Sequence, residues 1–266
     1  MQTLKRWLCV GLVLTLFSAM ALGSSSDSES ENKGETSSIT GKVDSVSATA
    51  EENSSNSDSE NAEKSSEPKY EVGEGIITTW TNSIGSTWIR VAIPVTNTGD
   101  VNLYLSSGSI DIENSSGSLE DTLKLVSAYP QILRPGETAY YFDETSYDGQ
   151  ETTDLKAIPH VDVKKAKVDC IRYSVSDIQI KDTDYFGAKV SGRVENTTDT
   201  EDSMIYIVAN LFDANGVLIG QQFTILSESL APGEKIGFET SSLSDNISAD
   251  QVASYEIFAY PNQYQF

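Results

Sequence analysis

The chain has 266 residues, of which 40 are acidic and 18 basic, and its formal net charge at pH 7 is −22. A surface this negative repels phosphate backbones and anionic lipids, which argues against nucleic-acid binding. The single histidine excludes a zinc site built from several histidines.

The first 23 residues have the order of a secretory signal peptide. Lys5 and Arg6 precede an uncharged, mainly apolar run, 7–22, and small residues follow at Ala21 and Gly23. The run is shorter than the roughly 20 residues that a membrane-spanning helix needs. We therefore expect an exported protein whose mature form has no stable membrane span, although the segment could also be retained as an anchor.

The position after the signal argues against a lipid anchor. Bacterial lipoproteins need Cys there, and this chain has Ser24. Cys9 lies within the signal, so the mature chain keeps only Cys170 and cannot form an internal disulfide. Because Cys170 alternates with Val168, we expect a small buried core residue on a strand.

Residues 24–69 are predicted to be a disordered linker. The segment contains 15 Ser, 11 acidic and 4 basic residues, and no aromatic residue. Such a composition buries too little apolar surface to offset the chain entropy lost on folding. It would act as a spacer between the folded part and a surface.

From residue 70 onward, short stretches alternate between apolar and polar residues, which predicts β-strands. The clearest are 186–195, 204–212, 217–226, 235–239 and 252–260. In 204–212, one face carries Ile205, Ile207, Ala209 and Leu211, whereas the other is mixed. Turn residues separate the stretches and no long helical period occurs, so the pattern indicates β-sandwiches.

An internal repeat divides this region at an offset of about 100 residues. The paired segments are 97–100 with 196–199, 114–117 with 213–216, and 133–137 with 230–234. The repeat predicts an all-β protein of two tandem Ig-like sandwiches, 70–172 and 173–266. No Gly or Pro separates the two copies, so we expect a short, stiff junction that joins them end to end as an elongated rod. Pro94, within a strand of the first copy, is expected at a sheet edge or at a position without a ladder hydrogen bond.

The second copy resembles the FxLYD domain family, which comprises small Ig-like β-sandwiches of secreted proteins and lipoproteins of Gram-positive bacteria. The resemblance is carried by 190–196, 209–213, Gly216 and 230–234. Ala209 and Phe212 depart from the Phe and Tyr of the family's motif. The resemblance implies a fold and an extracytoplasmic location, and it brings no catalytic residues.

No catalytic, cofactor-binding or metal-binding residues are predicted, and we expect the protein not to be an enzyme. His160 is the only candidate base; it follows Pro159 in an expected connection, and no nucleophile motif accompanies it. Acidic loops could hold calcium, but their spacing matches no EF-hand and solvated turns are the favoured interpretation. These loop residues are Glu195, Asp199, Glu201, Asp202, Asp182 and Asp184.

Six aromatic residues could form an exposed recognition patch, although core packing is the favoured explanation for most of them. They are Trp80, Trp88, Tyr140, Tyr141, Phe142 and Tyr147. The sequence thus predicts a secreted or surface-associated, non-catalytic binding or spacer module of the bacterial cell envelope, with a protein or envelope component as partner. The alternative is an accessory or inhibitor protein that docks onto a secreted enzyme.

Overall fold

The structure is a computed structural model that describes residues 67–150, 152–183, 187–240 and 247–262. These residues form seventeen β-strands and one short 3-10 helix, η1 (Ala249–Gln251), and contain no α-helix. The predicted all-β class is confirmed. No helix in the described ranges is long and apolar enough to cross a membrane. The predicted signal peptide and residues 24–66 of the predicted linker lie outside these ranges.

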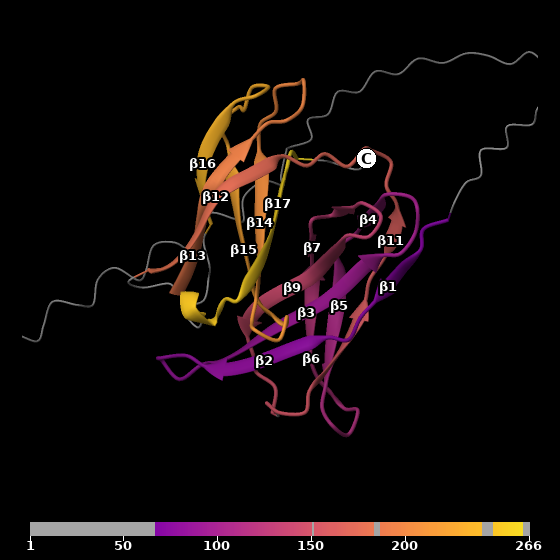
Figure 1. The fold of residues 1–266 in the computed structure, drawn as a ribbon. Coiled ribbons are helices and arrows are strands. Elements are labelled where there is room, and N and C mark those ends of the chain that lie inside the picture. Colours follow the sequence, from indigo (N-terminus) through magenta and orange to yellow (C-terminus); the bar gives the residue numbers. More distant parts are fainter. Residues whose placement is uncertain (1–66, 151, 184–186, 241–246, 263–266) are drawn as a thin grey trace, which may run out of the picture. The chain divides into compact units, whose positions relative to one another are not determined.

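The first half of the described chain, residues 67–172, is built from one large and two small antiparallel sheets (Figure 1). The five-stranded sheet comprises β1 (Tyr70–Val72), β2 (Ile76–Thr81), β3 (Thr87–Asn97), β9 (Thr138–Ser146) and β7 (Ala128–Tyr129). One small sheet comprises β10 (Lys156–His160), β5 (Gly108–Glu113) and β6 (Leu119–Val126). The other comprises β11 (Val163–Lys165), β4 (Leu103–Leu105) and β8 (Ile132–Leu133).

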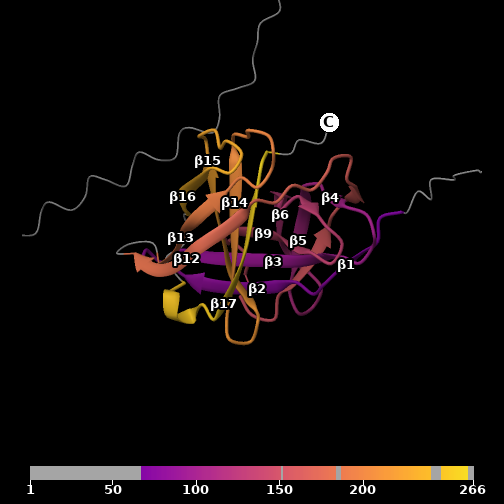
Figure 2. The same cartoon turned by 45° about the horizontal axis from the view of Figure 1, so that its top comes forward.

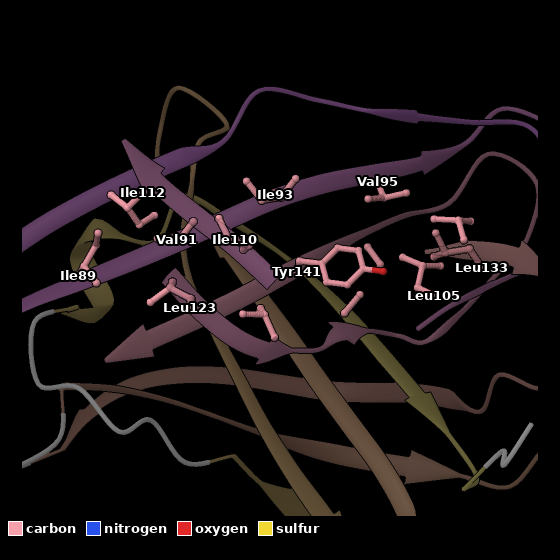
Figure 3. Packing of buried hydrophobic residues seen from close by; sticks show 14 of the residues in the cluster. Ile89, Val91, Ile93, Val95, Leu105, Ile110, Ile112, Leu123, Leu133 and Tyr141 are labelled. Atoms are coloured by element: carbon pink, nitrogen blue, oxygen red, sulfur yellow. The ribbon is translucent and has the colours of Figure 1, made fainter. Parts of the chain in front are cut away.

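The core of the first half lies between these sheets. Alternate residues of β3 are fully buried, and Ile110 and Ile112 of β5 belong to the same cluster together with Tyr141 of β9 (Figure 3). Burying each aliphatic side chain contributes about 1.5–3 kcal/mol, and the alternation places all of them on one face of β3. The buried β3 residues are Ile89, Val91, Ile93 and Val95.

Pro94 lies in an interior strand, so the expectation of a sheet edge is wrong. β3 pairs with β9 on one side and with β1 and β2 on the other. The N and O atoms of one residue in an antiparallel strand point to the same side. The Pro94 oxygen accepts a hydrogen bond from Gly73 N (2.9 Å), so its nitrogen faces the break between β1 and β2. The alternative expectation, a position without a ladder hydrogen bond, holds only for the Pro94 nitrogen, because the Pro94 oxygen accepts the bond from Gly73.

A β-bulge shapes the free edge of the β10–β5–β6 sheet. The register shifts between Gly108 and Ser109, and Leu125 of β6 is the extra residue, with a left-handed φ of 58°. Leu125 is 84% exposed. Bulges of this kind twist an edge strand and hinder its pairing with another chain.

The second half, residues 173–262, contains two three-stranded antiparallel sheets (Figure 2). One comprises β12 (Ser174–Thr183), β13 (Gly187–Glu195) and β16 (Lys235–Glu239). The other comprises β15 (Leu218–Leu226), β14 (Ile205–Phe212) and β17 (Ser254–Tyr260). Both sheets contribute to one buried cluster, and the predicted inner face of β14 is confirmed.

The same hydrogen-bonded latch occurs in both halves and supports the predicted repeat. Asn97 and Asn196 are completely buried. The Nδ2 of Asn97 donates to Val101 O (2.8 Å) and to Leu133 O (3.1 Å). The Nδ2 of Asn196 donates to Thr200 O (2.7 Å) and to Leu230 O (2.8 Å). Each asparagine thus ties the end of a strand to the distant Leu-x-Pro-Gly-Glu turn.

The turns themselves are also duplicated. Gly136 and Gly233 have φ of 82° and 76°, which favours glycine, and their amides donate to the carbonyls of Asn97 and Asn196. Residues 114–117 and 213–216 likewise form matching turns that each end in a glycine of positive φ. The parallel therefore extends from the sequence to the individual backbone bonds.

A buried polar network joins the two sheets of the second half. The Nε2 of Gln222 on β15 donates to Ala188 O on β13 (2.7 Å). Thr240 donates to the Oε1 of Gln222 (2.7 Å), and its hydroxyl oxygen accepts from Val190 N (3.1 Å). Gln222 and Thr240 are each 1% exposed, so the network replaces water for these polar groups.

Candidate binding surfaces

His160 contacts an aspartate on the neighbouring strand. It lies on strand β10 rather than in the expected connection, and its Nε2 lies 2.9 Å from the Oδ2 of Asp111. Thr122 donates to the other oxygen of Asp111 (2.8 Å), and the hydrogen bonds from Thr122 and His160 lower the pKa of that carboxyl. The Asp111 carboxylate therefore lies between the Thr122 hydroxyl and the His160 imidazole.

Cys170 is a junction residue, which corrects the expectation of a core residue on a strand. It lies in the connection between β11 and β12 and is only half-buried. Its Sγ contacts Ile132 O at 3.6 Å. Desolvation raises the pKa of this thiol above its usual value, which disfavours the reactive thiolate.

Three of the acidic loop residues of the second half are bound by protein donors. Lys235 pairs with Glu195 at 2.9 Å, and Asp202 accepts a hydrogen bond from the Tyr173 hydroxyl. Asp182 accepts from the backbone of Ala249 (2.6 Å). Asp184 lies outside the described residues. Within them, no group of three or more His, Cys, Asp or Glu side chains is arranged to hold a metal ion.

The six aromatic residues of the expected patch serve different roles. Tyr141 and Tyr147 are buried in the first core, and the Tyr141 hydroxyl donates to Ser106 O (2.7 Å). Tyr140, on the opposite face of β9, contacts Phe212 of β14 with 6.1 Å between ring centroids. The structure therefore does not present these six side chains as one exposed patch.

The contact between Tyr140 and Phe212 belongs to an aromatic interface between the two halves. Tyr129 of β7 stacks on Phe223 of β15 at 6.3 Å and packs against a separate cluster of the second half. That cluster consists of Val208, Phe258 and Tyr260, with Tyr206 beside it. These side chains lie on the faces of the two sheets that point away from the cores. Contacts between sheet faces correct the expectation that the halves meet only end to end.

A cavity of about 20 Å³ lies at this aromatic interface. It is lined by Tyr129, Gln131, Ile132, Tyr206, Tyr260 and Asn262. A cavity of this size holds about one water molecule and is too small for an organic ligand.

A pair of stacked tryptophans lies beside a buried ion pair on the five-stranded sheet. Arg90 pairs with Glu144 at 2.8 Å, with side chains only 6% and 10% exposed. The Arg90 guanidinium lies 5.1 Å from the Trp80 ring, which stacks on Trp88 at 6.1 Å. Trp80 therefore packs against a neutralised charge, and both tryptophans are only partly exposed.

Asp143 provides a test of the electrostatics beside this ion pair. Burial raises its pKa, and its Oδ1 accepts a hydrogen bond from Glu144 N (2.8 Å). The folded state therefore holds the Asp143 proton more tightly than the unfolded state, and stability falls as the pH rises from the usual value through the raised pKa. We expect Asp143→Asn to raise the melting temperature at pH 7 and to have no such effect near pH 3. Thermal unfolding at both pH values checks this, and a stabilisation that is the same at both would contradict it.

Arg172 and the asparagine latches were not identified as structural residues from the sequence. Arg172 forms an ion pair with Glu137 at 2.8 Å and lies over the rings of Phe258 and Tyr260. The repeated Asn at equivalent turn positions was a usable signal for the latches, whereas nothing local marks Arg172.

Searches against protein-family models and curated proteins found no match to this chain.

Proposed function

We propose that this chain is an extracellular, non-catalytic module of a bacterial cell envelope that acts as a binding or spacer element. The observation that carries the proposal is the duplicated latch, because it builds the same rigid turn into two successive β-rich halves. A repeated scaffold connected through packed aromatic faces suits a protein that presents a binding surface better than one that catalyses a reaction. The resemblance of the second half to FxLYD domains and the signal-like first 23 residues support the extracytoplasmic location.

The proposed organisation is a signal peptide (1–23), an acidic linker (24–69) and two Ig-like sandwiches (70–172 and 173–266). In this arrangement the linker holds the folded part away from the cell surface. Because Ser24 replaces the Cys of a lipoprotein, we propose that the native protein is released or loosely held.

Fractionation of the native host, followed by affinity capture from surface extract, tests the proposal. We expect the protein outside the membrane fraction, and we expect Ser24→Cys to move it to the membrane. Capture of an envelope component would support the binding module. Specific capture of one secreted enzyme, with a change in that enzyme's activity, would instead support the accessory or inhibitor protein, and retention in the cytoplasm would refute both.

A further inference from the structure

Arg172 lies at the junction of the two halves, directly before Tyr173 and between strands β11 and β12. Its side chain is only 11% exposed. An arginine at a solvent-exposed linker would extend into water, so its burial indicates that the junction is packed rather than loose.

On one side, Arg172 is bound by the Leu-x-Pro-Gly-Glu turn of the first half. Its Nη2 donates to Ile132 O (2.6 Å) and to the Oε2 of Glu137 (2.8 Å). The same Oε2 accepts a hydrogen bond from Arg134 N (2.8 Å), so the carboxylate is already held in place. A pre-positioned, partly buried partner loses little side-chain entropy when the ion pair forms.

On the other side, Arg172 lies against the aromatic face of the second half. The guanidinium is 5.4 Å from the Phe258 ring and 5.5 Å from the Tyr260 ring. Tyr260 in turn stacks on Tyr206 at 5.8 Å. A planar guanidinium can stack on these rings and donate to the turn at the same time, whereas a lysine ammonium cannot reproduce this geometry.

Further contacts close the junction on both sides of Arg172. The Nη2 of Arg134 donates to Cys170 O (2.8 Å), and the pairs Tyr140–Phe212 and Tyr129–Phe223 lie between the same two halves. From these contacts we propose that Arg172 is a clamp that couples the two halves, so that they unfold as one cooperative unit instead of moving about a hinge. This inference concerns mechanics and does not depend on which ligand the protein binds.

The tryptophans make the coupling measurable in the full chain. Trp80 and Trp88 belong to the first half, and the second half contains no tryptophan. In a Trp7→Phe background, fluorescence therefore reports the first half. Hydrogen exchange of the β14 amides reports the second half. We expect the two urea midpoints to coincide in this background protein, and to separate by about 1 M in Arg172→Ala.

Two further variants keep the test decisive. Arg172→Lys retains the charge but loses the planar fork, and should also separate the midpoints. Arg193→Ala removes an exposed arginine whose Nε lies 3.7 Å from Asp177, and should leave the midpoints together. Coincident midpoints in Arg172→Ala or in Arg172→Lys would overturn the clamp, as would separate midpoints in the background protein.

Discussion

Replacing Asn196 by alanine is expected to lower the free energy of unfolding by about 3 kcal/mol. The side chain is fully buried, and its Nδ2 satisfies the carbonyls of Thr200 and Leu230. Its Oδ1 accepts from Thr198 N (2.9 Å). Each buried polar group left without a partner costs roughly 1–3 kcal/mol, and alanine can supply none of these bonds. Urea unfolding followed by circular dichroism measures the loss.

Asn196→Asp is the matched variant for this prediction. It keeps the shape and the acceptor but turns an oxygen toward the carbonyls of Thr200 and Leu230, so it should destabilise at least as strongly as alanine at pH 7. Ser203→Ala, at an exposed position on the same connection, should stay within about 0.5 kcal/mol of the unaltered protein. A loss below about 1 kcal/mol in Asn196→Ala would show that the latch is not a structural requirement.

Gln222→Leu is expected to lower the free energy of unfolding by a comparable amount, about 3 kcal/mol. Leucine has a similar size, so the loss comes from the Ala188 carbonyl, which is left without its donor, and from the lost hydrogen bond to Thr240, rather than from a cavity. Thr240→Val should also destabilise, because it removes the acceptor of Val190 N. Urea denaturation of each variant measures these losses.

The double variant Gln222→Leu, Thr240→Val tests whether the two side chains stabilise the protein together or independently. Gln222 and Thr240 share one hydrogen bond, so removing both should cost less than the sum of the single changes by about 1 kcal/mol or more. Strict additivity would mean that the two side chains stabilise the sheets independently.

Local periodicity was sufficient to predict five of the six strands of the second half and the inner face of β14. Ile205, Ile207, Ala209 and Leu211 alternate along β14 and enter the core as expected. The other face of β14 was mixed in the sequence, and its apolar members contact the first half. Alternation cannot distinguish a strand that is covered on both faces from one with scattered exposed apolar residues.

The long-range hydrogen bonds could not be predicted from the sequence, for a different reason. The partners of Asn97 and Asn196 include carbonyls 36 and 34 residues away, and backbone acceptors carry no sequence signature. The position of Pro94 was predicted only in part. Proline has no backbone N–H, so its nitrogen had to lie where no donor is needed, but the sequence did not reveal that this position is the break between β1 and β2. His160 was expected in a connection but lies on a strand, and Cys170 was expected on a strand but lies in a connection. Both predictions failed because tertiary pairing sets the boundaries of short elements.

The two Leu-x-Pro-Gly-Glu turns differ in the contacts that their second residue can make. In the first half its second residue is Arg134, which binds the backbone of Cys170, and Glu137 receives Arg172. In the second half the corresponding residue is Ala231, which has no side chain capable of such a bond. The turn of the first half therefore binds the junction, whereas the Ala231 side chain cannot form the corresponding bond. A permuted protein in which the second half precedes the first would keep both cores and both asparagine latches. Its new junction would lie beside Ala231, and it would therefore lack the hydrogen bond that Arg134 donates to the junction backbone.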